Sequence, residues 1–247
     1  MSLDGGGAVG GVTAQDVDIL YFNGASWSLF FDASGVGIST SGQDVNDFYI
    51  VDADTILMSF DAATTIGGLA VNPWDIVQFD GTSLGSNPVF TFSLYFDGDD
   101  FGLTTTNGGY IDALEVLPDG RILISTTSNL SVPGVIGADE DILAFTPTTL
   151  GDATSGAWAM YFDGSDVGLD TSDEDIDALD VAPNGNIYLS VSGIFAVNGV
   201  AGADEDVFVC TPTSLGDVTA CNYLSGLYLD GGTWGLDAND VDGVNLP

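Results

Sequence analysis

The sequence repeats with a period of about 66 residues, and this repetition limits the folds open to the chain more than any other feature. Each copy has an aromatic strand that ends in Asp, then a loop of Gly, Ser, Thr and Asp, and then an apolar strand that follows another Asp. The copies span residues 27–48, 92–114, 157–179 and 227–244. Their first aspartates are Asp32, Asp97, Asp163 and Asp230, which are 65, 66 and 67 residues apart. A fixed period of this length is typical of a fold built from repeated supersecondary units.

Each full repeat predicts four short β-strands. In the second repeat these are residues 111–117, 121–126, 141–145 and 158–163, with the turn Pro118-Asp119-Gly120 between the first two. Asp-Gly and Asn-Gly between apolar runs are strong hairpin signals. Residues 1–11 are rich in Gly without periodicity and predict a flexible leader before a single repeat domain, residues 12–247. Within this domain we expect partial-unit strands at 12–43, repeats at 44–108, 109–173 and 174–238, and a closing strand at 239–247.

Tandem four-stranded units resemble the blades of secreted β-propeller repeat proteins. The resemblance is architectural, and it implies an all-β fold, a small propeller of about four blades. The N-terminal strands at 16–22 and 26–32 would join the C-terminal strand at 240–246 in a composite blade. Strand two of that blade is missing from the pattern, so a short blade, a natural chain that continues, and an open edge that pairs with a neighbouring molecule all remain open. The alternative fold is an open stack of four-stranded β units.

The charge of the chain is extreme. It has 37 acidic residues, a single basic residue (Arg121) and no His, which gives a net charge of −36. This excludes nucleic-acid binding through phosphate neutralisation and electrostatic attachment to an anionic membrane. No apolar run is long enough to predict membrane insertion. Bound divalent cations, high salt or low pH must offset the self-repulsion. Because nearly all the acids are Asp in Gly-rich loops, we favour Ca²⁺ as the cofactor.

The loop after strand four is the predicted Ca²⁺ site. Its third copy is the richest in carboxylates, with Asp163, Asp166, Asp170, Asp173 and Asp175. The other copies supply Asp97, Asp99, Asp100, Asp230, Asp237 and Asp240. In the alternative interpretation these are solvated turn residues that bond their own backbone.

Two further acidic positions recur once in each repeat. The third residue of strand one is Asn46, Asp112, Asp177 or Asp242. These four would form a ring at a channel mouth that binds a cation or a shared proton, or else make hydrogen bonds between blades. An acidic element precedes strand three and ends in Asp18, Asp75, Asp141 or Asp206. Its regularity predicts a structural role, such as capping backbone N–H groups in a turn, and the alternative is cation binding by the fuller versions at 138–141 and 203–206.

Two smaller features bear on compartment and ligand. Cys210 and Cys221 enclose one strand-to-strand connection, which predicts a disulfide and therefore an extracellular or cell-surface location. Trp74 and Trp234 lie outside the aromatic pattern of the strands, and we consider them as stacking platforms for sugar rings.

The residue inventory favours a protein that is not an enzyme. Without His or Lys, and with both cysteines paired, the usual nucleophile and base cannot be assembled. Our first hypothesis is an exported, Ca²⁺-stabilised propeller that acts as a cell-surface, matrix or adhesive module, with carbohydrate or another surface protein as its partner. The alternatives are a carbohydrate-binding or glycoside-hydrolysing protein that uses paired carboxylates, and a structural subunit that self-associates by strand exchange.

Overall fold

The computed structural model describes residues 1–38, 43–81 and 90–246. Within these residues the fold is all-β, and the helical elements are 3₁₀ turns of three or four residues. No helix in this part of the chain is long and apolar enough to cross a membrane.

Three four-stranded antiparallel sheets follow one another along the chain, and in each the strands lie in sequence order. The four strands per repeat that the sequence predicts are therefore present. The third repeat differs from the other two in its outer strand. This strand ends at Tyr223, and only Leu229 pairs again, with Val207. The first sheet contains β6 (Val45–Ile50), β7 (Thr55–Phe60), β10 (Ile76–Gly81) and β11 (Phe90–Phe96). The second contains β12 (Ile111–Val116), β13 (Ile122–Thr126), β16 (Ile142–Thr149) and β17 (Ser155–Phe162). The third contains β18 (Ala178–Val181), β19 (Ile187–Ser190), β22 (Phe208–Ser214) and β23 (Ala220–Tyr223).

The two ends of the chain meet in a fourth group of strands. We call β24 (Asp240–Gly243), β1 (Ser2–Asp4), β4 (Ile19–Phe22) and β5 (Trp27–Phe31) the terminal strand group. Ser2 of β1 lies opposite Gly243 of β24, and Met1 and Leu20 exchange two backbone hydrogen bonds of 2.8 Å. The four strands are thus ordered like strands one to four of a repeat.

The expected flexible leader at residues 1–11 is wrong. Ser2 and Leu3 are buried in β1, and β2 (Gly7–Val9) pairs with β3 (Val12–Ala14). The strand two that the sequence pattern lacked is supplied by Ser2–Asp4, a segment too short to show a periodicity of its own.

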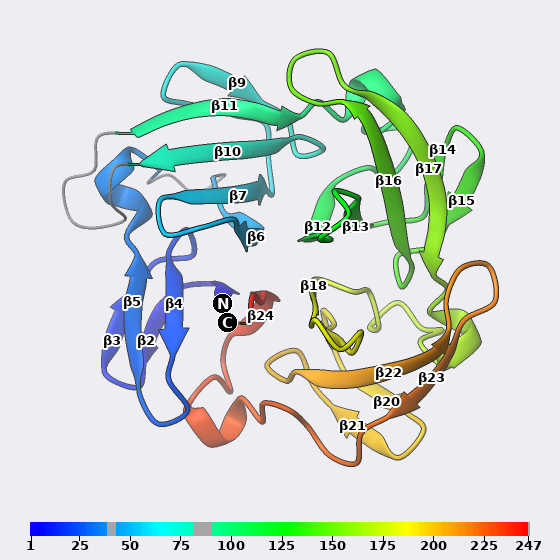
Figure 1. Ribbon diagram of the computed structural model, residues 1–247. Helices are drawn as coiled ribbons and strands as arrows, with labels where there is room; N and C mark the ends of the chain where they lie inside the picture. The colour runs from blue at the N-terminus through cyan, green and yellow to red at the C-terminus, as the bar shows by residue number, and fades with distance from the viewer. Residues whose placement is uncertain (39–42, 82–89, 247) are drawn as a thin grey trace.

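The sheets are arranged around a common centre, with the first strand of each innermost (Figure 1). β12 contacts both β6 and β18, and β24 contacts all three of the other inner strands. Figure 1 also shows both chain ends close to this centre. Residues at the start of the four inner strands are therefore brought together.

Small hairpins between strands two and three were not predicted. They pair β2 with β3, β8 (Thr64–Ile66) with β9 (Leu69–Val71), β14 (Leu130–Val132) with β15 (Val135–Gly137), and β20 (Phe195–Val197) with β21 (Val200–Gly202). The dipeptide Asn198-Gly199 was the available signal, since Gly199 takes a φ of 85° in the turn.

The core and the disulfide agree with the sequence. Phe31, Phe96 and Phe162 end the outer strand of their groups and are almost completely buried. The predicted disulfide joins Cys210 of β22 to Cys221 of β23, with their Cα atoms 5.5 Å apart.

Candidate functional site

A cavity of about 250 Å³ lies where the inner strands begin. Three equivalent positions of the repeated unit supply its walls. The predicted ring contributes Asn46, Asp112, Asp177 and Asp242; the position two residues earlier contributes Asp44, Asp175 and Asp240; and the position after strand two contributes Asp4, Asp61, Thr127 and Ser192. The structure thus brings the whole predicted ring together, and adds Asp175 and Asp240 from the predicted Ca²⁺ set. Asp4 and Asp61 were not predicted as site residues.

Six carboxylates of this cavity each have at least one buried oxygen without a hydrogen-bond partner among the described residues. The Oδ1 atoms of Asp112, Asp177 and Asp242, and also Oδ2 of Asp177, are buried without a partner in the described chain, and these three residues are only 6–8% exposed. Asp44, Asp175 and Asp240 each have one buried oxygen that also has no hydrogen-bond partner in the described chain. An unpaired buried charge is costly, so these oxygens require protons or cations.

Burial and mutual repulsion raise the pKa of the cavity carboxyls. Burial raises the pKa of Asp44 and Asp175 to about 8 and that of Asp240 to about 7, and neighbouring carboxylates add to each shift. The pKa values of Asp112, Asp177 and Asp242 lie well above 3.8, again first because of burial. Asp44 and Asp175 therefore hold protons at neutral pH when no cation is bound.

No basic group of the protein neutralises the cavity. Arg121 is the only Lys or Arg, and its Nε bonds Asp119 at 2.9 Å on the surface. Burial lowers the pKa of the Met1 amino group to about 5, so this group is neutral at pH 7. Any positive charge in the cavity must come from outside the protein.

Asn46, the ring residue of the first sheet, differs from the three ring aspartates because its side chain has a hydrogen-bond partner. Asn46 donates from Nδ2 to the carbonyl of Ile111 at 3.0 Å, which ties β6 to β12. The adjacent Asp47 accepts from the N–H of Leu114 at 2.6 Å. The alternative interpretation of the ring, a hydrogen bond between neighbouring repeats, therefore holds for Asn46.

The cavity is wider than a tight metal cage. No three acidic side chains in the described part of the chain converge closely enough to hold a metal ion as they stand. A volume of about 250 Å³ corresponds to the space of roughly eight water molecules. The arrangement therefore suits a cation that keeps part of its hydration shell, or carboxylates that move inward around it.

The predicted loop site is not assembled in the same way. Asp166 accepts from the N–H of Thr219 at 2.9 Å, and Asp100 accepts from the N–H of Thr154 at 2.8 Å. Asp163 accepts from the Ser165 hydroxyl at 2.7 Å. Asp99, Asp170, Asp173, Asp230 and Asp237 are exposed, and Asp97 is half-buried. Asp100 and Asp166 thus bond the backbone of the next repeat and not that of their own turn. Ca²⁺ binding by the loop remains a prediction.

The aspartates before strand three cap the backbone, as predicted. Asp141 accepts from the N–H of Ala138 at 2.8 Å through Oδ2 and from the N–H of Gly164 at 2.9 Å through Oδ1. Asp18, Asp75 and Asp206 each make the same pair of bonds, to the residue three positions earlier and to a residue that follows strand four. Each cap fixes the start of strand three against the end of strand four.

The two predicted stacking tryptophans are half-buried. The Trp74 ring lies 6.2 Å from that of Tyr110, and its indole N–H is buried. The Trp234 ring packs against Phe22 at 4.7 Å and lines a second, apolar cavity. Neither is an open platform on the surface.

No protein-family model, curated protein or solved structure matches this chain. The chemistry of the acidic cavity is therefore the main guide to function.

Proposed function

We propose that the chain is a four-bladed β-propeller whose central acidic cavity binds divalent cations, Ca²⁺ first among them, and that it acts as a non-catalytic, exported surface, matrix or adhesive module. The observation that carries the proposal is the set of buried, unpartnered carboxylate oxygens on Asp112, Asp177 and Asp242. Four-stranded units around one centre, with the chain ends sharing one unit, support the propeller.

Cation binding solves two problems of this chain at once. It supplies positive charge to oxygens that have no N–H donor, and it reduces the repulsion among eight aspartates on one cavity wall. Hard oxygen ligands of this kind suit Ca²⁺, which accepts six to eight oxygens in flexible geometry. The cation would tie the inner strands of all four units together at the point where they meet.

A glycoside-hydrolysing role has less support. It needs one carboxyl held protonated beside another that stays ionised. All the cavity carboxyls with a resolved shift have a raised pKa. The disulfide supports an oxidising compartment, and hence export.

The test is calorimetric titration of chelator-stripped protein with CaCl₂ at about pH 8, together with the Asp177→Asn variant. Asp177 has two unpartnered oxygens, so we expect its loss to weaken Ca²⁺ binding by about tenfold or more. Binding should also weaken toward pH 5, because Ca²⁺ must displace protons from carboxyls with raised pKa.

Asp170→Asn is the matched control, since it removes the same charge from an exposed residue of the predicted loop site. It should leave Ca²⁺ affinity within about twofold of the parent protein. If Asp170→Asn abolishes binding and Asp177→Asn does not, the loop is the site and the cavity proposal fails. If NaCl stabilises the stripped protein as well as CaCl₂ does, neither site is specific.

A further inference from the structure

The acidic cavity has more carboxylates than one divalent cation needs. Eight aspartates line it, and six of them have at least one buried oxygen without a hydrogen-bond partner among the described residues. An EF-hand loop, for comparison, surrounds one Ca²⁺ with about three or four carboxylates. A single cation in this cavity would therefore leave most of the negative charge unbalanced, and unbalanced buried charge is costly.

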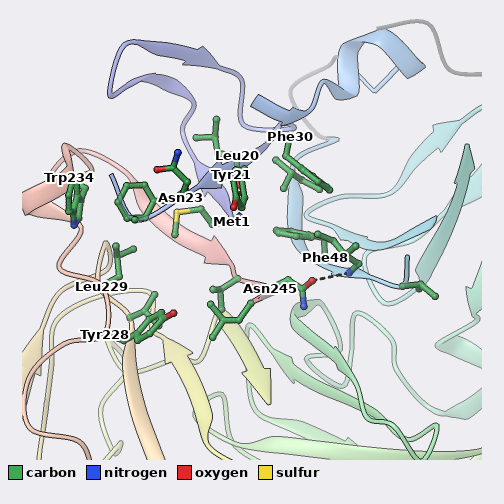
Figure 2. A pocket seen from close by; sticks show the side chains of 18 of the residues that line it. Met1, Leu20, Tyr21, Asn23, Phe30, Phe48, Tyr228, Leu229, Trp234 and Asn245 are labelled. Carbon is green, nitrogen blue, oxygen red and sulfur yellow. Dashed lines mark hydrogen bonds between the residues drawn. The ribbon is translucent and has the colours of Figure 1, made fainter. Parts of the chain in front are cut away.

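The larger cavity of the protein offers no second place for such a cation. It has a volume of about 1170 Å³ and lies beside the far ends of the inner strands, away from the acidic cavity (Figure 2). Figure 2 shows apolar side chains around it, among them Phe30, Phe48 and Leu229. Asp52 is the single acidic residue among the described residues that line it. Of these two cavities, only the acidic one can hold more than one hard cation.

Place in the repeated unit shows how the carboxylates of the acidic cavity are distributed. Asp44, Asp175 and Asp240 occupy the same position of the unit, near the starts of β6, β18 and β24. β6 and β18 lie across the centre from each other, with β12 and β24 between them (Figure 1). Asp44 and Asp175 therefore lie on opposite sides of the cavity.

The β12 side of the cavity is poor in carboxylates. Tyr110 stands there at the position that Asp44 occupies in the first repeat, and Thr127 stands at the position that follows strand two. The β24 side, in contrast, carries three aspartates, Asp4, Asp240 and Asp242. The carboxylates thus form an arc that runs past β24 and do not surround one central point.

Repulsion between neighbouring carboxylates divides this arc into two groups. We call Asp112, Asp175, Asp177 and Asp240 the third-sheet group, and Asp4, Asp44, Asp61 and Asp242 the first-sheet group. Asp177 is repelled by the other three members of its group. Asp44 is repelled by Asp4 and Asp61, and among neighbouring carboxylates Asp44 repels Asp242 most. Asp242 also repels Asp177, so the two groups adjoin at β24.

We propose that the acidic cavity holds two divalent cations, one bound by the third-sheet group and one bound by the first-sheet group. This assignment rests on the proposed function, because it divides the proposed cation binding between two sites. Each group supplies one ion with four carboxylates, close to the number in an EF-hand loop. Asp240 and Asp242 lie two residues apart on β24, so their side chains point to the same face and each can serve one ion.

The two sites should differ in affinity. The third-sheet group contains five buried oxygens without a partner, two of them on Asp177. The first-sheet group contains two, on Asp44 and Asp242, and its other two members are exposed. Because a buried oxygen attracts a cation through less water, the third-sheet site should fill first. A volume of about 250 Å³ leaves room for water ligands that complete both coordination shells.

The test counts the cations and assigns each one to its group. Chelator-stripped whole protein is titrated with CaCl₂ at about pH 8 in a calorimeter, and bound Ca²⁺ is counted by native mass spectrometry. We expect two Ca²⁺ per chain in two binding events. Asp44→Asn and Asp175→Asn are a matched pair, because the two residues hold the same position in the unit and each has one buried oxygen without a partner.

Each variant should act on a different binding event. Asp175→Asn should weaken the tighter event at least about tenfold more than the weaker one, and Asp44→Asn should do the reverse. The exposed Asp170→Asn is the control and should leave two Ca²⁺ per chain.

Replacing Ca²⁺ by MnCl₂ tests whether the two ions share one cavity. Two Mn²⁺ ions within a volume of about 250 Å³ are close enough to broaden each other's EPR signal. We expect a broadened signal from the parent protein with two Mn²⁺ bound, and a narrow signal from Asp44→Asn, which keeps one. A narrow signal from the doubly occupied parent protein would overturn the proposal, because the ions would then lie in separate parts of the molecule.

The outcomes separate this proposal from the one on which it rests. One Ca²⁺ per chain, weakened alike by Asp44→Asn and Asp175→Asn, would overturn the assignment of two ions and leave the proposed function intact. Two Ca²⁺ per chain, one of them removed by Asp170→Asn, would also overturn it, because the second ion would then lie in the loop. A stripped protein that binds no Ca²⁺ would refute the proposed function together with this assignment.

Discussion

Removing divalent cations and raising the pH from about 5 to about 7 should destabilise the protein, because of the carboxyls in the acidic cavity. Burial and repulsion raise the pKa of Asp44 and Asp175 to about 8 and that of Asp240 to about 7, against 3.8 for a free Asp. A carboxyl whose pKa is higher in the folded protein stabilises the fold fully below pH 3.8. That stability is lost as the pH rises toward the folded pKa, because the unfolded chain gives up the proton first.

The size of the effect follows from the number of protons involved. Each such carboxyl lowers the free energy of unfolding by about 1.4 kcal/mol per pH unit between the two pKa values. We count Asp175 alone, whose pKa of about 8 keeps its proton in the folded protein over this range, and the other cavity carboxyls with raised pKa values add to the slope. From about pH 5 to about pH 7 this amounts to about 3 kcal/mol, which lowers the Tm of a chain of this length by about 5–11 °C.

Calorimetric unfolding in chelator at low salt, across this pH range, measures the slope. Asp175→Asn removes one of the titrating groups and should flatten the slope by about 1.4 kcal/mol per pH unit, whereas the exposed Asp170→Asn should leave it unchanged. Ca²⁺ added near pH 8 should restore the lost Tm. A Tm that stays level or rises with pH in chelator would refute the reasoning, because the cavity carboxyls would then have ordinary pKa values.

Two further predictions concern the scaffold. Asp141→Ala leaves the backbone N–H groups of Ala138 and Gly164 without their acceptor and should lower the free energy of unfolding by about 2–4 kcal/mol, measured by urea denaturation; the exposed Asp152→Ala should change it by less than about 0.5 kcal/mol. Cys210→Ser removes the disulfide and should cost about 2–3 kcal/mol, and a Tm that is equal with and without reductant in the parent protein would contradict this.

Most strands could be predicted because each one recurs in several repeats, so that its pattern of apolar residues and turn residues could be compared between copies. The second strand of the second repeat was predicted at 121–126 and is found as Ile122–Thr126. The N-terminal strand was missed because three residues carry no periodicity, although the match of Met1-Ser2-Leu3 to Met58-Ser59-Phe60 was visible in the sequence. The early end of β23 at Tyr223 could not be predicted, since the alternation continues through Leu227 and Leu229.

The site was predictable only in part. Position in the repeat identified the ring of Asp112, Asp177 and Asp242, because strand one was assumed to lie innermost. Asp4 ends β1 and Asp61 directly follows β7. Both join the cavity only because the strands converge in three dimensions, which the sequence pattern does not show. Ca²⁺ binding was first predicted for the loops because they contain many aspartates. Sequence does not say that oxygens of Asp100 and Asp166 accept N–H groups of the next repeat.

Aspartates that look alike in the sequence thus divide into two physical classes. Asp18, Asp75 and Asp141 each accept two backbone N–H groups, which favour the charged form and partly offset the cost of burial. Asp177 and Asp242 have buried oxygens with no such donor, so the cost of ionisation is concentrated where the inner strands begin. Monovalent salt screens exposed charges over about 10 Å but acts little on buried ones. General adaptation to salt would therefore relieve the exposed aspartates and leave the cavity unstable, whereas a bound divalent cation acts where the unpaired oxygens are.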